Sequence, residues 1–492
     1  MSKFYILGID QSTQGTKALI FDDRGKILSR YDLPHKQIIS ENGWVSHDAE
    51  EIYANLTKVI QGVIEKSGID KKSIRCMGIS NQRETTVVWD RETGKPLDYA
   101  IVWQCNRAKD ICRKMEKLGC QDVIYAKTGL KLSPYFPASK MSWFMENVPA
   151  AKKLSENGKL ALGTVDSWLV YKLTGGKSFK TDYSNASRTQ LFNLTDLKWD
   201  KEICDIFGIT MDSLPEVCDS NAFYGNTDLE GYFDTAIPIC GVLGDSHGAL
   251  FGHNCRGKGK IKATYGTGSS IMLNIGDRPV FSKHGIVTSL AWGIDGKVDY
   301  VLEGNINYTG AVISWIKNDV QLIESAEEAG RLAKQANPAD RTYLVPAFTG
   351  LGAPYWKSDA HGILVGLSRS TGKNEIVRAA CDCISYQIND IVEAMAKDTG
   401  LDIRELCVDG GPTKNDYLMQ FQSDISDLTV NVPSSEELSA MGAAFMAGMS
   451  IGLYDIDKVY ETILYQFYHK NMPEELRREK IDGWKSAVNM LL

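Results

Sequence analysis

The feature that most constrains this chain is one β-hairpin pattern that occurs twice, half a chain apart. Near the start, two strand-like runs, residues 5–10 and 16–22, flank the polar turn Gln-Ser-Thr-Gln-Gly. In the second half, runs 260–265 and 270–275 flank the turn Gly-Thr-Gly-Ser in the same way. A chain that uses the same device twice is expected to fold as two α/β domains with a cleft between them.

The turns of the two hairpins have the composition of phosphate-binding loops. They carry small hydroxyl residues and glycine, namely Ser12, Thr13 and Gly15 in the first turn and residues 266–269 in the second. Such turns expose backbone N–H groups and hydroxyls to phosphate oxygens without side-chain bulk. One hairpin of this kind is usually only a hairpin. Its repetition favours a nucleotide phosphate clamp, the pattern of two actin/hexokinase-like (ribonuclease H-like) domains.

Two charged residues accompany the first turn. Asp10 ends the first strand, where a carboxylate can hold Mg²⁺ through water. Lys17 returns on the second strand with the opposite charge. The sequence therefore predicts a Mg²⁺ and phosphate site at this end of the hairpin.

The spacing of apolar residues predicts a helix over residues 48–64. Asp48 and Glu51 form an expected capping pair at its start, and Gly68 follows its end. The helix supports an α/β class for the first half of the chain.

The second half has a long helical pattern over residues 374–397 and a strand-like run at 405–409. Because both halves combine helices with the same hairpin, we place the domain boundary near residue 253. The expected domains are residues 1–253, with the first phosphate hairpin, and 254–492, with the nucleotide site.

A Gly-Gly turn follows the strand at 405–409. Gly410 and Gly411 let a ligand approach the backbone closely, and the helix start expected after them favours anionic groups. Asn415 lies just beyond. A tight strand–helix turn without a ligand explains the pattern equally well.

Asp245 follows the apolar run 237–243 and is the candidate catalytic residue. A carboxylate there can accept the proton of a hydroxyl as the hydroxyl attacks a γ-phosphate. Taken alone, the residue is better explained as a cap of the next helix.

Arg83 and Glu84 lie between two strand-like runs. Such a pair can hydrogen-bond vicinal hydroxyls, although a lone Arg–Glu pair is usually a surface ion pair.

Composition excludes several classes of function. The chain has 55 Lys and Arg against 62 Asp and Glu, a formal charge of −7, which argues against nucleic acid as a partner. No apolar run of about 18 residues predicts a membrane span. The first ten residues do not read as a signal peptide, so we expect a cytoplasmic protein. Eleven scattered cysteines, without a C-x-x-C pair, indicate reduced, mostly buried thiols.

Longer segments resemble one family over nearly the whole chain, the FGGY carbohydrate kinases, and most closely its glycerol-phosphorylating members. They are GIDQSTQGTKALIFD (8–22), SNQRETTVVWDRETGKPL (80–97), YFPASKMSWFMEN (135–147), TVDSWLVYKLTGG (164–176), TDYSNASRTQLFN (181–193), YGTGS (265–269), PAFTGLGAPYW (346–356) and VDGGPTKNDYLMQFQSDI (408–425).

The resemblance implies ATP-dependent phosphorylation of a small polyol or open-chain sugar, with Mg²⁺, by a homo-oligomer, expected to be a dimer. Asp245 matches the family's general base and Asp10 its Mg²⁺-associated carboxylate. The positions that match acceptor contacts are Arg83, Glu84, Trp103 and Tyr135. Those that match nucleotide contacts are Thr13, Gln14, Lys17, Thr267, Gly310, Gly411 and Asn415.

Two departures bear on the acceptor. Ser246 stands where these kinases usually have Gln, and Ser270 where they usually have Phe. Two small hydroxyls in place of an amide and a ring predict a wider pocket, with Ser246 and Ser270 binding a four- or five-carbon polyol or ketose. The alternative is glycerol itself, converted to glycerol 3-phosphate.

Two other classes of function compete with a kinase. An actin-fold ATPase that produces only a conformational change would leave the polar and aromatic acceptor residues unexplained. A sugar- or nucleotide-sensing regulator would need a nucleic-acid-binding appendage, which the sequence does not contain. The sequence therefore favours the kinase.

Overall fold

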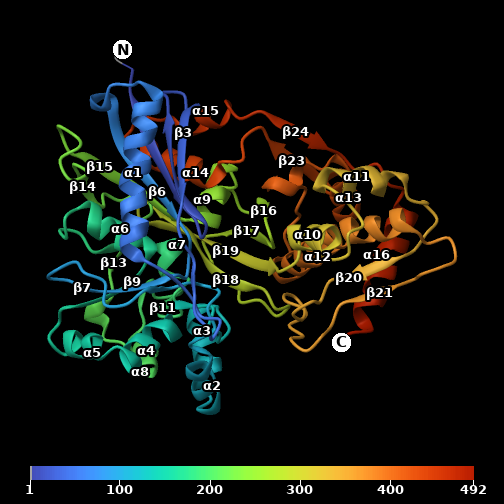
Figure 1. Ribbon diagram of the computed structural model, residues 1–492, viewed down its shortest axis with the longest axis horizontal. Helices are drawn as coiled ribbons and strands as arrows, with labels where there is room; N and C mark the ends of the chain where they lie inside the picture. Colours follow the sequence, from blue (N-terminus) through green and yellow to red (C-terminus); the bar gives the residue numbers. More distant parts are fainter. Residues whose placement is uncertain (1–2) are drawn as a thin grey trace.

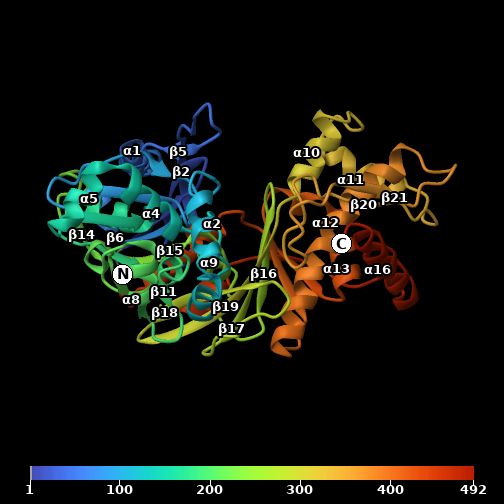
Figure 2. The same ribbon diagram turned by 90° about the horizontal axis from the view of Figure 1, so that it is seen from below.

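The computed structural model describes residues 3–492, which form two α/β lobes (Figures 1 and 2). This arrangement confirms the predicted fold class. The first lobe contains a six-stranded sheet in the order β14-β15-β6-β1-β2-β3. Its strands are β1 (Tyr5–Gln11), β2 (Gly15–Phe21), β3 (Ile27–Pro34), β6 (Ile74–Asn81), β14 (Gly225–Thr227) and β15 (Ile237–Gly244).

The predicted first hairpin is confirmed as β1 and β2. The two strands are antiparallel, and Asp10 lies opposite Lys17. Their side chains alternate between two apolar layers. Leu7 and Ile9 pack against helix α1 (Ala49–Ser67), and Ile6 packs on the opposite side of the sheet. Because both faces are covered, the hairpin is held rigidly in the core.

The predicted helix over residues 48–64 is confirmed as α1, which runs three residues further, to Ser67. The Asp48 side chain accepts a hydrogen bond from the N–H of Glu50, and Gly68 ends the helix at φ 68°. The predicted capping pair is wrong in its second member. Glu51 accepts from the backbone N–H of Lys36, because the chain before the helix passes within 3.2 Å of its carboxylate.

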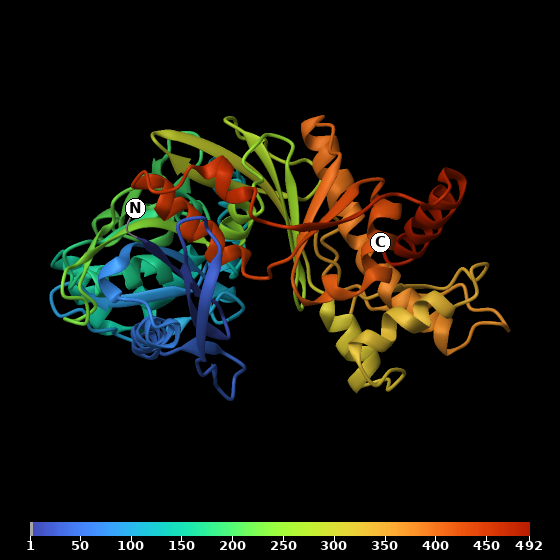
Figure 3. The ribbon, with the colours of Figure 1, turned by 90° about the horizontal axis from the view of Figure 1, so that it is seen from above.

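A helix from the end of the chain covers the other face of this sheet. Helix α14 (Leu438–Ser450) packs on β1, β6, β15 and helix α9 (Asp245–Gly252) (Figure 3). Small residues permit the close contact: a Cβ on Gly442 would lie 1.9 Å from the carbonyl oxygen of Gly248. The boundary at residue 253 stays a prediction, and any spatial division has to place α14 with the first lobe.

The second lobe is built on a seven-stranded sheet in the order β18-β19-β17-β16-β22-β23-β24. The second predicted hairpin is confirmed as β16 and β17, which are antiparallel. The strands are β16 (Ile261–Tyr265), β17 (Ser269–Gly276), β18 (Val287–Ile294), β19 (Lys297–Ile306), β22 (Glu405–Asp409), β23 (Thr429–Pro433) and β24 (Tyr465–Tyr468).

The helices of the second lobe include the predicted long one, α12, whose apolar positions are buried in the core of this lobe. Their bounds are α10 (Gly310–Asn318), α11 (Ala326–Gln335), α12 (Lys373–Thr399), α13 (Asp416–Ser426) and α16 (Glu474–Asn489). The short helix α15 (Ile456–Tyr460) follows α14, and strands β20 (Tyr343–Val345) and β21 (Ile363–Val365) form a separate antiparallel pair.

The first lobe contains a second, five-stranded sheet in the order β4-β5-β8-β7-β9. Strand β7 belongs to this sheet and does not pair with β6. Residues 82–85 therefore cross from one sheet to another. Its strands are β4 (Ile38–Ile39), β5 (Val45–His47), β7 (Thr86–Asp90), β8 (Ala100–Ile101) and β9 (Leu160–Thr164).

Shorter elements surround this sheet. The helices are α2 (Lys109–Lys117), α3 (Gln121–Thr128), α4 (Pro137–Asn147), α5 (Pro149–Glu156), α6 (Val165–Leu173), α7 (Tyr183–Ala186) and α8 (Lys201–Phe207). Two further strand pairs are β10 (Lys180–Asp182) with β13 (Glu216–Cys218) and β11 (Phe192–Asn193) with β12 (Lys198–Trp199).

All eleven cysteines are free and nine are buried, as predicted. Over residues 3–492, no helix has the length and apolar character to cross a membrane.

Candidate active site

The first phosphate hairpin places Asp10 and Lys17 side by side at the end of β1. Lys17 Nζ lies 3.4 Å from Asp10 Oδ2 and 3.2 Å from Glu437 Oε2, a carboxylate beside the start of α14. Burial raises the pKa of the Asp10 carboxyl, and Lys17 opposes that shift. Lys17 therefore provides the compensating charge that the sequence predicted.

The turn after Asp10 joins the two groups of predicted site residues. Trp103 Nε1 donates a hydrogen bond of 2.9 Å to Thr13 Oγ1, while Gln14 is exposed to solvent. Thr13 is a predicted nucleotide residue and Trp103 a predicted acceptor residue. The bond fixes the indole against the phosphate turn.

Trp103 and Tyr135 form an aromatic wall next to that turn. Their ring centroids lie 5.6 Å apart with the planes tilted by 60°, and both side chains are half-buried. Apolar ring faces beside polar groups suit the carbon skeleton of a polyol.

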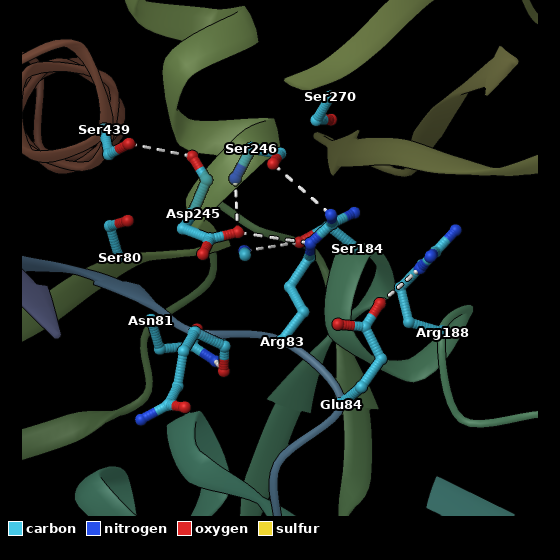
Figure 4. Close-up of polar contacts among 12 residues, drawn as sticks. Ser80, Asn81, Arg83, Glu84, Ser184, Arg188, Asp245, Ser246, Ser270 and Ser439 are labelled. Atoms are coloured by element: carbon cyan, nitrogen blue, oxygen red, sulfur yellow. Dashed lines mark hydrogen bonds and ion pairs between the residues drawn. The ribbon is translucent and has the colours of Figure 1, made fainter. Parts of the chain in front are cut away.

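Arg83 occupies the centre of the site (Figure 4). Its Nε donates to Asp245 Oδ1 at 3.2 Å and its Nη2 to Ser246 Oγ at 3.3 Å. The same guanidinium donates both Nη groups to Glu303, at 2.9 and 2.7 Å. The alternative of a surface ion pair is wrong, because Arg83 is buried and pairs with residues 162 and 220 positions away.

Glu84 has a different partner from Arg83. Its Oε1 accepts from Arg188 Nε at 2.6 Å, and both side chains are buried. Glu84 has a φ of 60°, in the left-handed region, and its carboxylate binds Arg188 instead of the adjacent Arg83 (Figure 4).

Two residues of this cluster, Arg188 and Glu303, were missed by the sequence analysis. Arg188 Nη1 lies 2.8 Å from Glu303 Oε2, so Glu303 holds both arginines. The signal for Glu303 was a single carboxylate within the strand-like run Tyr-Val-Leu-Glu-Gly. Arg188 lies in the segment 181–193 that carries the family resemblance.

The hydroxyls of Ser246 and Ser270 are both bound to this cluster. Ser246 Oγ accepts from Arg83, and Ser270 Oγ donates to Glu303 Oε1 at 3.1 Å. Both side chains are half-buried, so they border the site and already have partners within the protein.

Asp245 is the first residue of α9 and lies at the end of β15. Its Oδ1 also accepts from the backbone N–H of Ser246 at 2.6 Å. The side chain is 35% exposed, which leaves it accessible from the site. Burial raises the pKa of the Asp245 carboxyl and Arg83 opposes the shift, so the carboxylate is a stronger base than an ordinary aspartate.

Three predicted nucleotide residues line one groove of about 800 Å³ in the second lobe: Gly310, Gly411 and Asn415. Gly410 and Gly411 do not enter a helix directly, because a 3₁₀ turn (Gly411–Lys414) comes first and α13 begins at Asp416. Asn415 caps α13, accepting from the N–H of Leu418.

Thr267 connects the second phosphate turn to α10. Its carbonyl oxygen accepts from the N–H groups of Thr309 and Ala311, each at 3.0 Å. The turn of the second hairpin is thereby tied to the start of the helix that carries Gly310.

The residues present fit a hydrated Mg²⁺ better than a protein-caged ion. Among residues 3–492, no group of three or more His, Cys, Asp or Glu side chains could hold a metal. Mg²⁺ commonly binds one or two carboxylates and keeps several waters beside substrate phosphates, and the buried Asp10 carboxylate meets that need.

Comparison with known proteins defines the class. Two models of the FGGY family of carbohydrate kinases match, the N-terminal domain over residues 5–252 and the C-terminal domain over residues 261–451. Two glycerol kinases are similar: that of Oceanobacillus iheyensis is 45% identical over 99% of this chain and 98% of its own. Glycerol kinase 1 of Thermotoga maritima is 46% identical over 99% of each.

A solved structure agrees. Plasmodium falciparum glycerol kinase with ADP superposes with a TM-score of 0.94 and 35% identity, covering 99% of this chain and 98% of that one. The protein is thus an ATP-dependent carbohydrate kinase. The chain belongs to the FGGY family, and within it to the glycerol kinase type.

Proposed function

We propose that this kinase transfers the γ-phosphoryl group of ATP to a terminal hydroxyl of glycerol. The observation that carries the proposal is the hydrogen bond from Trp103 to Thr13, which sets the aromatic wall of the acceptor site against the phosphate turn. Burial raises the pKa of the Tyr135 phenol and the nearby Arg83 opposes that shift, and Arg83 in turn donates to Asp245, which links the wall to the proposed base. The glycerol kinases among the relatives support glycerol as that acceptor.

Asp245 is the proposed general base. The acceptor oxygen forms a bond to the γ-phosphorus while the bond from that phosphorus to the β–γ bridging oxygen breaks, and the hydroxyl proton passes to Asp245. ADP leaves with the bridging oxygen. The raised pKa of Asp245 favours acceptance of the proton.

The other acceptor residues bind and orient. Arg83 and Glu84 fix the hydroxyls that do not react, and Trp103 and Tyr135 pack against the carbon atoms. Ser246 and Ser270 hold Arg83 and Glu303 in place. Orientation of this kind supplies much of the rate in phosphoryl transfer, where positioning and charge stabilisation dominate.

ATP is assigned to both hairpins and to the groove of the second lobe. Thr13, Gln14, Lys17 and Thr267 border the phosphates, whereas Gly310, Gly411 and Asn415 line the remainder of the nucleotide site. Asp10 would hold Mg²⁺ through water. When bound, the ion neutralises charge on the phosphates.

A longer acceptor is the second candidate, favoured by Ser246 and Ser270. These small side chains leave more room than an amide and a ring. Their hydroxyls already bind Arg83 and Glu303, however, so they offer an additional sugar hydroxyl fewer free partners than the sequence predicted. We therefore rank a four- or five-carbon polyol or ketose below glycerol as the candidate acceptor.

The test is an ADP-release assay that compares kcat/KM for glycerol, erythritol, xylitol, ribulose and xylulose. Glycerol as the best substrate supports the proposal. A larger kcat/KM for any four- or five-carbon acceptor transfers the assignment to the second candidate. Absence of phosphorylation with all five acceptors overturns both. The expected dimer is a separate prediction, which light scattering of the purified protein can check.

A further inference from the structure

Glu303 is the most enclosed charge of the site. It lies on β19, its side chain is fully buried, and three partners surround it. Arg83 donates to both carboxylate oxygens, Arg188 lies 2.8 Å from Oε2, and Ser270 donates to Oε1 at 3.1 Å.

Glu303 is ionised in this environment. Burial opposes its charge, yet Arg188 and Arg83 outweigh burial and hold the pKa of Glu303 well below its usual range. With Glu84, which binds Arg188, the cluster contains two cations and two anions. Such a group is stable in the interior only while each charge keeps its partner.

The carboxylate reaches the site from the opposite half of the chain. Arg83, Glu84 and Asp245 precede residue 253, whereas Glu303 belongs to the sheet of the second lobe. It therefore fixes an acceptor-site residue relative to the sheet that also carries the second phosphate turn.

The geometry determines which nitrogen of Arg83 faces the base. A guanidinium presents its donors in a rigid plane. Glu303 takes Nη1 and Nη2 from one edge, which leaves Nε toward Asp245. Without this anchor, the guanidinium is free to turn its two-pronged edge to Asp245, an arrangement that carboxylates prefer.

We propose that Glu303 is a positioning residue for phosphoryl transfer, which holds Arg83 so that it orients the acceptor without pairing fully with Asp245. The proposal rests on the function proposed above. It assigns Glu303 no contact with substrate.

The sign of the electrostatic effect follows from the groups around Asp245. The charged ones are Arg83 from the β6–β7 connection, Asp10 from β1 and Lys262 from β16, and α14 contributes the Ser439 hydroxyl to the Asp245 carbonyl. Removal of the Glu303 charge leaves Arg83 unopposed. The pKa of Asp245 then falls, and the acid limb of kcat/KM moves to lower pH.

The experiment compares Glu303→Gln, Glu303→Asp and the control Asp299→Asn in the full chain. Asp299 is on the same strand, four residues or about 13 Å away, beyond the Debye length of about 10 Å at 0.1 M salt. We measure KM for glycerol and ATP, kcat, the pH profile and thermal unfolding. The ¹³C carboxyl shift of Asp245, assigned with Asp245→Asn, follows the same titration without turnover.

Glu303→Gln is expected to lower kcat/KM for glycerol by about 100-fold, the typical cost of a small misplacement, with little change in KM for ATP. In Glu303→Gln, the acid limb of the pH profile of kcat/KM and the titration of the Asp245 carboxyl carbon both move to lower pH. Glu303→Asp keeps the charge, so the titration of Asp245 stays near wild type. Its kcat/KM falls because the shorter side chain cannot hold both Nη groups of Arg83. Asp299→Asn is expected to change neither kcat/KM nor the Asp245 titration.

Two results overturn the proposal. One is Glu303→Gln with wild-type kcat/KM and titration. The other is a loss that follows only the folded fraction, with both KM values and the pH profile unchanged, which would make Glu303 purely structural. If Glu303→Gln does not fold, Glu303→Asp decides through its kcat/KM. If the wild type phosphorylates no polyol, the proposed function fails, and the carbon titration still decides whether Glu303 sets the Arg83–Asp245 geometry.

Discussion

Gly410 and Gly411 are adjacent, and substitution of each is expected to have a different effect. Gly410 has a φ of 99°, and a Cβ there would lie 2.0 Å from the carbonyl oxygen of Tyr265. A Cβ on Gly411 would meet no atom within 4 Å, and this residue lines the groove assigned to the nucleotide. The fold requires the first glycine, and we expect the proposed nucleotide to require the second.

Gly410→Ala should destabilise the second lobe. With φ 99° and ψ 166°, Gly410 has a backbone conformation that is essentially restricted to glycine and costs an alanine about 1–3 kcal/mol. The overlap forces β16 and β22 apart at a further cost of about 1–3 kcal/mol. The total of about 2–6 kcal/mol is a large share of a typical unfolding free energy of about 5–15 kcal/mol. A clear fall in the thermal unfolding midpoint is expected.

Gly411→Val should leave that midpoint nearly unchanged, because surface substitutions usually change the free energy of unfolding by no more than about 0.5 kcal/mol. The branched side chain stands in the groove. If it costs the nucleotide about 1–3 kcal/mol, as excess volume does in packed sites, KM for ATP rises about 5- to 150-fold. KM for glycerol should change little.

The assay is a coupled ADP-release measurement in which ATP and glycerol are varied in turn, combined with thermal unfolding of wild type and both variants. Equal increases in the two KM values for a folded Gly411→Val would refute the nucleotide assignment. Wild-type stability of Gly410→Ala would refute the steric argument.

The remaining predictions concern the acceptor site. Asp245→Asn should lower kcat by about 100-fold or more with unchanged nucleotide affinity, since a general base contributes about 10²–10⁴-fold; a single-turnover rate above about a tenth of wild type would contradict that role. Because burial raises the pKa of Asp245 and the base must be deprotonated, kcat/KM should fall on acidification at a higher pH than the pKa of an ordinary aspartate would give; an acid limb of the pH-rate profile in the range of an ordinary aspartate or below it would argue against it. Ser270→Phe narrows the pocket and should raise the ratio of kcat/KM for glycerol to that for xylitol, and an unchanged ratio would place residue 270 outside the acceptor pocket. Glu303→Gln should lower kcat/KM for glycerol as described above.

Local sequence determined the elements that hold the site. Both hairpins, helix α1 and helix α12 follow from alternating or helical apolar spacing and from turn residues a few positions apart. Asp48 and Gly68 limit α1 as expected because capping involves only neighbouring backbone groups. Turn and strand positions singled out Thr13, Arg83 and Gly411, and the resemblance to the family added Trp103 and Gly310.

Only the tertiary structure decided how those residues pair. Arg83 and Glu84 are neighbours in the sequence and bind different partners, 220 and 104 residues away. Glu303 looks like an isolated charge in an apolar strand until the two lobes meet, and α14 covers a sheet formed by the opposite end of the chain. Hydrogen bonds and ion pairs act over about 3 Å in space, and nothing in local spacing encodes which distant segments the packed core brings to that distance.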